Sequence, residues 1–269
     1  MSGGGPTWKK ALKLSIHSTA IIDKSAELAD DVEIGPYTVI GPGVKIGSGT
    51  IIGPHVYIYK NTTIGSECVI WKSVSMGTDS QDLKYRGQPT YLEIGDRTSI
   101  REFATLNRAT TENEATRVGS DCLLMAYTHV AHDCRVGSNV ILSNAVNMAG
   151  HVAIDDYAII SGMTCIHQFV RVGIHSFIGG GSRVPKDVAP FVMAVGNPIM
   201  LNGLNTVGLQ RKGFSEEVRL ELKRAYKIFF RSQYNISQAL EHARSELKPL
   251  PEIKAFTDFI AHSERGVII

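Results

Sequence analysis

This 269-residue sequence is poor in cysteine, in net charge and in long apolar runs. Its four cysteines include no CxxC pair, which argues against a disulfide framework and against a cysteine-liganded zinc site. We expect them to be small residues of the core, namely Cys68, Cys122, Cys134 and Cys165. The formal net charge of +2 gives no reason to expect a nucleic-acid partner. Because the apolar runs span only a few residues, we expect no integral membrane segment.

The start of the chain, MSGGGPTWKKALKLS, has no apolar core of signal-peptide length. The composition, with 43% hydrophobic and 20% charged residues, is ordinary for a soluble protein. Together these features predict a cytoplasmic protein, long enough for one large domain or for a domain with an appendage.

What the sequence does contain is a repeat of six residues. An aliphatic residue recurs at every sixth position from Ile16 to Ile70, and the register resumes at Ile94 and again from Val118 to Val184. Glycine often follows it, and the fifth position of each hexad is usually small or β-branched. A helix repeats every 3.6 residues and a strand every two, so this period fits neither as a continuous element. It fits short strands in stacked coils, with one bulky and one small residue per strand pointing inward.

This pattern resembles the hexapeptide-repeat proteins, which implies an all-β solenoid, a left-handed parallel β-helix. Three hexads form each triangular coil in that family. Neighbouring coils are expected to lie about 4.8 Å apart, because this is the spacing of hydrogen-bonded strands. The handedness comes from the resemblance, because the general rule for parallel connections favours right-handed crossovers. We expect the β-helix over residues 16–196 and a C-terminal α-helical domain over residues 197–269.

The repeat is interrupted in three places. Residues 78–93 and 109–117 lose the aliphatic-and-small pattern and are predicted to be loops that leave the prism. Loops on a rigid scaffold often carry function, although plain solvent exposure is the simpler interpretation of the second. After residue 197 the repeat stops, and the helices that follow are expected to cap the solenoid or to pack on a neighbouring subunit. Their predicted starts are Ser215, Asn235 and Pro251.

Histidines recur at intervals close to one coil. His132 and His151 are 19 residues apart, and His151 and His167 are 16 apart, so all three are expected near one edge of successive coils. His129 is half a hexad from His132. A single histidine would more often be structural, but four in one band favour a functional site. Histidine titrates near neutrality, which suits general acid–base chemistry.

Charged residues near this band suggest what it binds. Asp133 directly follows His132, and its carboxylate could orient the imidazole if the chain turns a corner there. The loop motif QDLKY supplies Asp82 and Lys84, and Arg211 lies just beyond the repeat. Cations near histidines suggest a phosphate-bearing ligand, although a surface cation is usually only solvated.

Five stretches carry a closer resemblance. In order, they are QDLKY, IREFATLNRAT, LLMAYTHVAHDCRVGS, AGHVAIDDYAIISGMTCIHQF and GLNTVGLQRKGF. They resemble the UDP-N-acetylglucosamine 3-O-acyltransferases of lipid A biosynthesis, and the resemblance extends from about Ile16 to Gly266. It implies a homotrimer without a cofactor or metal, with active sites between adjacent prisms. The reaction it implies is transfer of a 3-hydroxyacyl group from acyl carrier protein to the glucosamine 3-position of UDP-N-acetylglucosamine.

The resemblance also implies roles for individual residues. His132 matches the family's general base, Asp133 the residue that orients it, and the Gly150 backbone N–H the donor to the oxyanion. Gly180 matches the position that gauges acyl length, where a glycine leaves room for a longer chain of the hydroxymyristoyl class. The other matched positions are substrate contacts: Asp82, Lys84, Asn107, His129, His151, His167, Gln168, Asn205, Arg211 and Lys212.

Three of the matched positions depart from the family pattern. Asn107 stands where a histidine is common, Val207 where an acidic residue is common, and Lys212 where a second arginine is common. Lysine cannot form the forked pair of hydrogen bonds that arginine forms. These changes leave the acyl-transfer residues intact but leave two acceptors open, the 3-hydroxyl sugar and a 3-amino sugar nucleotide.

Three other functions stay open on the sequence alone. Some hexapeptide-repeat enzymes of the carbonic anhydrase type bind zinc through three histidines between subunits. A non-catalytic scaffold needs no histidine band, but it would share the fold. An acyltransferase that uses acetyl-CoA is the third. The basic residues after residue 210 could instead receive an acidic carrier protein, or form only a solvated helix face.

Overall fold

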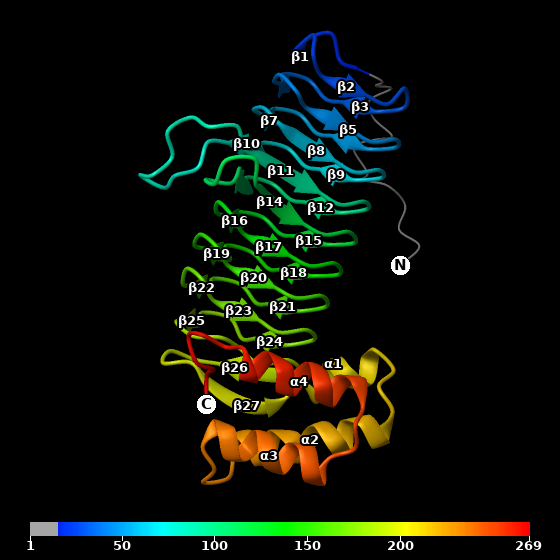
Figure 1. Ribbon diagram of the computed structural model, residues 1–269. Helices are drawn as coiled ribbons and strands as arrows, with labels where there is room; N and C mark the ends of the chain where they lie inside the picture. Colours follow the sequence, from blue (N-terminus) through cyan, green and yellow to red (C-terminus); the bar gives the residue numbers. More distant parts are fainter. Residues whose placement is uncertain (1–15) are drawn as a thin grey trace.

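The computed structural model describes residues 16–269, so the expectation about the first fifteen residues lies outside the described part of the chain. Short strands stack in three sheets that form the sides of a long prism, and helices lie at its C-terminal end (Figure 1). Strands from the three sheets alternate along the sequence, so each turn of the chain around the prism adds one strand to each sheet.

Each sheet is parallel apart from the last strand pair. Sheet 1 contains β1 (Ile21–Ile22), β4 (Val39–Ile40), β7 (Tyr57–Ile58), β10 (Ser75–Thr78), β13 (Thr105–Asn107), β16 (His129–Val130), β19 (Asn147–Met148), β22 (Cys165–Ile166) and β25 (Arg183–Val184). Sheet 2 contains β2 (Glu27–Leu28), β5 (Lys45–Ile46), β8 (Thr62–Ile64), β11 (Tyr91–Ile94), β14 (Ala115–Val118), β17 (Arg135–Val136), β20 (Ala153–Ile154) and β23 (Arg171–Val172). Sheet 3 contains β3 (Glu33–Ile34), β6 (Ile51–Ile52), β9 (Val69–Ile70), β12 (Ser99–Ile100), β15 (Leu123–Leu124), β18 (Ile141–Leu142), β21 (Ile159–Ile160), β24 (Phe177–Ile178), β26 (Val192–Val195) and β27 (Met200–Leu204).

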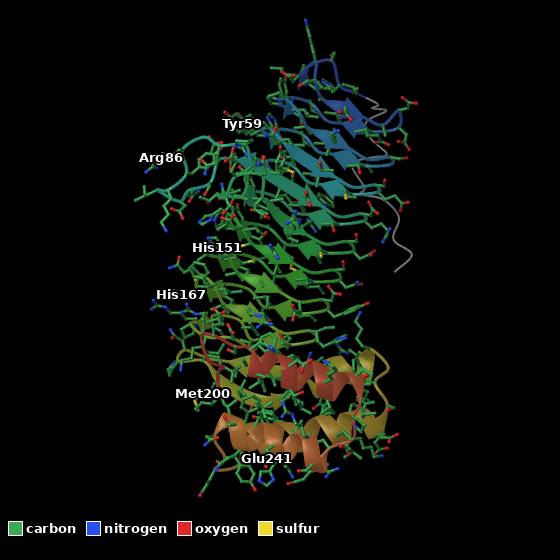
Figure 2. The ribbon with its side chains drawn as sticks, in the orientation of Figure 1. Tyr59, Arg86, His151, His167, Met200 and Glu241 are labelled. Atoms are coloured by element: carbon green, nitrogen blue, oxygen red, sulfur yellow. The ribbon has the colours of Figure 1, made fainter. Side chains whose placement is uncertain are left out.

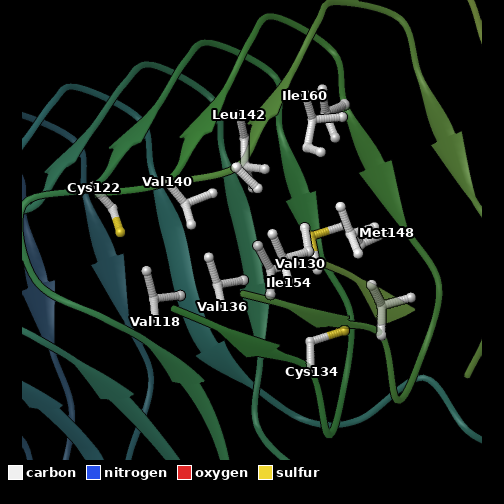
Figure 3. Packing of buried hydrophobic residues seen from close by; sticks show 14 of the residues in the cluster. Val118, Cys122, Val130, Cys134, Val136, Val140, Leu142, Met148, Ile154 and Ile160 are labelled. Carbon is white, nitrogen blue, oxygen red and sulfur yellow. The ribbon is translucent and has the colours of Figure 1, made fainter. Parts of the chain in front are cut away.

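The six-residue repeat builds the core of the prism. Ile40 pairs with Ile58, so residues in the same hexad position stack one coil apart. Figure 3 shows Val118, Val136 and Ile154 following one another along the inside of the prism. The aliphatic residue and the small residue two positions before it are both buried, because alternate strand residues share a face. Truncating one such aliphatic residue to alanine should cost about 2–5 kcal/mol.

The cysteine prediction is only partly right. Cys68, Cys122 and Cys134 fill fifth positions of hexads and are buried, and burial raises the pKa of the Cys134 thiol to about 12. Cys165 is exposed, because it precedes the inward-pointing Ile166 on β22 and therefore faces outward.

The two predicted loops are shorter than expected. The segment between β10 and β11 covers residues 79–90 and projects from the prism (Figure 1), and the segment between β13 and β14 covers residues 108–114. Residues 91–93 and 115–117, predicted to be loop, belong to four-residue strands that pair with each other. The pairing of Tyr91 with Ala115 closes the bases of both excursions.

The C-terminal part begins with a hairpin that the repeat did not predict. β27 pairs antiparallel with β26 and so extends sheet 3 to Leu204. The helices α2 (Glu216–Phe230), α3 (Ile236–Glu246) and α4 (Pro251–Ala261) begin where the sequence predicted. Ser215 and Asn235 accept hydrogen bonds from the first turns, as N-cap residues do. The short α1 (Thr206–Arg211) was not predicted.

Among residues 16–269, no helix has both the length and the apolar character needed to cross a bilayer.

Candidate active site

One edge of the prism carries the histidines. The turns 131–134, 149–152 and 167–170 each connect sheet 1 to sheet 2, and the excursions 79–90 and 108–114 leave the prism at the same edge. We call these five segments the histidine edge. The prediction that His132, His151 and His167 stack near one edge is therefore confirmed, and Figure 2 shows His151 and His167 on the same side of the prism as Arg86. His129 lies on β16, on the adjoining face of sheet 1.

Left-handed backbone conformations produce the corner at which the central residues meet. Asp133 and His151 have φ values of 59° and 60°, in the region where a side chain costs roughly 1 kcal/mol or more. The sharp bend allows Asp133 to turn back on its neighbour, as the sequence argument required. His132 Nδ1 lies 2.8 Å from Asp133 Oδ2, and both side chains are largely buried.

The Asp133 carboxylate is held from several sides. It accepts the Thr110 backbone N–H at 3.1 Å on each oxygen, and His151 Nε2 lies 3.6 Å away. Burial by itself would raise the pKa of Asp133, but the hydrogen bonds from His132 and Thr110 and the nearby His151 lower it below its ordinary value. An ionised Asp133 holds the proton of His132 on Nδ1, which leaves Nε2 free to accept another proton.

Gly150 forms the surface beneath the His132 ring. A Cβ atom at position 150 would lie 2.3 Å from His132 Cε1 and 2.5 Å from Nε2. The Gly150 carbonyl accepts the Phe169 N–H, whereas the Gly150 N–H has no hydrogen-bond partner within residues 16–269. A free backbone donor therefore lies close to the free nitrogen of the imidazole.

The remaining histidines surround this pair. His129 Nδ1 lies 2.7 Å from Thr105 Oγ1, and burial, followed by the neighbouring His132, lowers the pKa of His129. His151 crosses His132 nearly at a right angle, with 5.3 Å between ring centroids, and stacks on Phe169 at 4.6 Å. The rings of His132, His151 and Phe169 thus form one continuous aromatic surface.

The next coil extends this surface. His167 is exposed, as is its neighbour Gln168, and Arg265 from the C-terminal segment reaches to 3.3 Å from His167 Nδ1.

The loop residues Asp82 and Lys84 are available for binding. The Asp82 carboxylate accepts the Lys84 backbone N–H at 2.8 Å, which forms a small turn, and the Asp82 N–H donates to Ser80 Oγ. The Lys84 ammonium group has no hydrogen bond or ion pair within the described residues 16–269. Both residues belong to the excursion 79–90 of the histidine edge.

Two of the predicted contact residues have structural partners. Asn107 is 3% exposed and donates to Thr78 Oγ1 at 2.8 Å and to the Asp79 carbonyl at 2.9 Å. Its Oδ1 is buried without a partner. The Asn205 side chain caps α1 by accepting the Gly208 N–H, and its Nδ2 donates to the His175 carbonyl. Both amides are therefore engaged in holding the fold of this chain.

The other predicted contacts lie at different edges. Gly180 falls in the turn 179–182 between sheets 3 and 1. Lys212 Nζ lies 4.7 Å from the ring centroid of Tyr157, which belongs to a turn between sheets 2 and 3. Arg211 is exposed at the end of α1. A single chain therefore does not bring these residues to His132.

Sequence reasoning missed Thr110, which lies in a segment interpreted most simply as solvent-exposed. The Thr110 side chain is only 9% exposed. No pattern marks a residue that acts through its backbone N–H, because every residue except proline has that group.

One group of side chains in residues 16–269 has the spacing of metal ligands. Ligand atoms of His132, Asp133 and His151 lie within 4.8 Å of one another. This set contains two histidines and a carboxylate, which differs from the three histidines of the carbonic anhydrase type considered above.

A prism of six-residue repeats with a histidine–carboxylate pair at one edge defines a hexapeptide-repeat transferase. The family model for the bacterial transferase hexapeptide matches residues 14–48, 43–77 and 115–150, and the model for domain 2 of UDP-N-acetylglucosamine O-acyltransferase matches residues 187–268.

Relatives match almost the whole chain. The acyl-[acyl-carrier-protein]--UDP-N-acetylglucosamine O-acyltransferase of Herminiimonas arsenicoxydans is 47% identical over 258 residues, which cover 94% of this chain and 98% of the relative. The protein of the same name from Thiobacillus denitrificans is 50% identical over 255 residues, covering 94% and 99%.

Solved structures agree with these sequence matches. The UDP-N-acetylglucosamine O-acyltransferase of Moraxella catarrhalis is 44% identical with a TM-score of 0.92, and 94% of this chain and 99% of that chain are covered. The enzyme of Bacteroides fragilis has the same coverage and TM-score at 40% identity. The chain belongs to the UDP-N-acetylglucosamine O-acyltransferase family, and its β-helix is left-handed, as predicted.

Proposed function

We propose that this protein transfers a 3-hydroxyacyl group from acyl carrier protein to the glucosamine 3-hydroxyl of UDP-N-acetylglucosamine, the first step of lipid A biosynthesis. The observation that carries the proposal is the His132–Asp133 pair at 2.8 Å, with the free Gly150 N–H beside the imidazole. The names of the relatives support the two substrates.

The chemistry follows from these three groups. His132 Nε2 takes the proton of the sugar 3-hydroxyl as that oxygen attacks the thioester carbonyl carbon. The Gly150 N–H donates to the oxyanion of the tetrahedral intermediate. When the intermediate collapses, the carbon–sulfur bond breaks, and the thiolate takes its proton from the His132 imidazolium. Asp133 keeps the ring oriented and stabilises its positive charge throughout.

The proposed substrate contacts are divided between the edge of this pair and other edges of the prism. Asp82 and Lys84 hold the sugar and the acyl donor from the loop, and Asn205 and Arg211 contact the nucleotide and the phosphopantetheine arm. Gly180 leaves space for a long hydroxyacyl chain. The remaining substrate contacts are Asn107, His129, His151, His167, Gln168 and Lys212.

The distribution of these residues over three edges supports a homotrimer. Gly180 and Lys212 lie at edges other than the histidine edge, so a complete site needs a second protomer to bring its own edge alongside. The outer face of sheet 3 provides an apolar surface for such contact. Its half-buried residues follow one another in register: Leu123, Ile141, Ile159, Phe177 and Met193.

In this assembly the β-helix of residues 16–196 supplies the walls of the site, and residues 197–269 supply contacts to the acyl donor. We expect the enzyme to be cytoplasmic.

A basic row on α2 suits the carrier protein. Four cations recur at helical spacing on one side of this helix: Arg219, Lys223, Lys227 and Arg231. They border a hollow of about 500 Å³ between α2, α1 and β27, with Leu204 and Leu209 among its lining residues. An acidic carrier protein would be attracted to this row, which would raise its association rate at low salt.

A 3-amino sugar nucleotide is the second candidate acceptor. Asn107 and Val207 depart from the family pattern, and the structure buries Asn107 while leaving Val207 56% exposed. An amine is a stronger nucleophile than a hydroxyl, so it would place less demand on the His132 base.

The test is a transfer assay with 3-hydroxyacyl-acyl carrier proteins of several lengths and both sugar nucleotides. Wild type should acylate the hydroxyl sugar, and His132→Ala should lower the rate roughly 10²–10⁴-fold without loss of folding. Reaction of the amino sugar alone would retain the mechanism and change the acceptor. Failure with every acyl donor would reject the acyltransferase function, and acylation from acetyl-CoA alone would replace the donor.

A further inference from the structure

Arg108 is a buried cation in the chain segment that leaves β13. Its side chain is 0% exposed, which is rare for arginine because burying a charge is costly without partners. It lies two residues before Thr110, whose backbone N–H binds Asp133. Neither Arg108 nor Thr110 has a part in the chemistry above, so a different reason is needed for burying a charge there.

The Arg108 guanidinium contacts the 79–90 loop at its start, middle and end. Nη1 donates to the Gly77 carbonyl at 2.9 Å, and Nη2 pairs with the Asp79 carboxylate. Nη2 also donates to the Tyr85 hydroxyl at 2.9 Å, and Nε approaches Thr90 Oγ1 at 3.4 Å. A single side chain therefore bridges both ends of this loop and its centre.

Tyr85 carries the connection further into the loop. Its hydroxyl accepts from Arg108 and donates to the Gln88 carbonyl at 3.1 Å. The Lys84 ammonium group has no partner among residues 16–269, and its backbone N–H is held by the Asp82 carboxylate within the same loop. The place of this turn relative to the prism therefore depends on the contacts of Tyr85 and Ser80.

Thr110 joins the same loop to the catalytic pair. Its hydroxyl lies 2.6 Å from Ser80 Oγ, and Ser80 Oγ accepts the Asp82 N–H at 3.1 Å. Its carbonyl accepts from the Gln88 side chain. Since the Thr110 N–H binds both oxygens of Asp133, a continuous path of hydrogen bonds runs from the Asp82 backbone to the His132 ring.

We propose that Arg108 and Thr110 are positioning residues, which hold the 79–90 loop so that Asp82 and Lys84 keep a fixed place relative to the His132–Asp133 pair. This proposal extends the proposed function, and what it says about catalysis depends on that function. A twelve-residue loop that is free to move would have to be ordered at each binding event, and this cost would weaken substrate binding.

Tyr85→Phe is the sharpest variant, because it removes one hydroxyl and leaves the buried arginine paired with Asp79. It should lower kcat/KM about 10-fold, mainly through a higher KM, while the acid limb of the pH profile keeps its position. Tyr37→Phe is the matched control, since Tyr37 is exposed in a turn at another edge and its hydroxyl has no partner within residues 16–269.

A double-mutant cycle separates positioning from general destabilisation. If Tyr85 acts through Lys84, Tyr85→Phe should cost little more in a Lys84→Met background. Additive losses, or wild-type kcat/KM in Tyr85→Phe, would overturn the proposal. Thr110→Val should lower kcat/KM and Thr110→Ser should restore it, because only the hydroxyl reaches Ser80; equal loss in both would point to packing alone.

Trypsin gives a readout that does not depend on activity. The exposed Lys84 and Arg86 are cleavage sites in the loop, and Tyr85→Phe should be cut there several-fold faster than Tyr37→Phe. Equal cleavage would overturn the holding role. If the wild type is inactive with every acyl donor, the proposed function and the catalytic part of this inference are rejected. The rate of trypsin cleavage still decides whether the loop is held.

Discussion

The backbone of Gly150 lies directly beneath the His132 imidazole, with room for no side chain between them. A methyl group at position 150 would approach Cε1 to 2.3 Å and Nε2 to 2.5 Å. Glycine is needed here for close approach, since its φ is not in the left-handed region. The relationship ties the proposed general base and the proposed oxyanion donor to one another.

Gly150→Ala should therefore displace the His132 ring and lower kcat by about 10²-fold or more, with the fold retained. Steady-state kinetics and thermal unfolding would be measured together. Gly35→Ala is the control, because its Cβ would be crowded as closely, 2.7 Å from Pro54 N, in a turn between sheets 3 and 1 near the N-terminal end of the prism. Near-normal turnover in Gly150→Ala would argue against His132 acting from its observed position.

Asp133→Asn should reduce kcat by about 10²–10⁴-fold. The amide cannot carry the negative charge that holds the proton on His132 Nδ1, so the imidazole can adopt the wrong tautomer. The measurement is kcat over a range of pH, with circular dichroism to check folding. A loss of less than threefold would show that the carboxylate is not the orienting group.

Acid should destabilise the protein through His129. Burial lowers its pKa in the folded state, so the unfolded chain binds more protons between pH 6.5 and the lower folded value. This contribution to the free energy of unfolding is present above pH 6.5 and is lost as the pH falls through that window. Urea unfolding at pH 7.5 and 5.5 should show a smaller difference for His129→Gln than for wild type; equal differences would exclude His129 as the source.

A charge on the outer face of sheet 3 should prevent trimer formation. Ile159→Arg would bury an unpaired cation between protomers, and light scattering should report a monomer. Because the proposed site draws residues from two protomers, transfer activity should be lost with the assembly. Thr63→Arg, on the exposed face of sheet 2, is the matched control and should remain trimeric and active. An active Ile159→Arg monomer would reject the shared site.

Reversal of the α2 charges should affect only the carrier protein. Lys223→Glu with Lys227→Glu should raise KM for the acyl carrier protein about 10-fold or more at low salt and leave KM for the sugar nucleotide unchanged. The effect should diminish as salt screens the charges. Lys24→Glu with Lys45→Glu, two exposed residues in the first coils of the prism, makes the same change in net charge and is the control. An equal effect on both substrates would mean that α2 does not receive the carrier.

The C-terminal helices show how far local signals reach. Ser215 and Asn235 were recognised as caps because a cap residue and the apolar stripe after it are adjacent in sequence. The six-residue α1 was missed, since its cap, Asn205, is stabilised partly by the distant His175 carbonyl. Residues 91–93 and 115–117 are strand where the sequence predicts loop, because these two strands pair with one another across a separation of 24 residues.

The sequence by itself determined the prism and the histidine edge. The six-residue period places the first, aliphatic residue of most hexads inward, and a spacing of about one coil places His132 and His151 at the same edge, because a solenoid converts sequence distance directly into position. Only the tertiary structure decided that Thr110 holds Asp133 and that Arg108 holds the loop. Those relationships depend on backbone donors and on long-range contacts of irregular segments, which have no period from which position can be read.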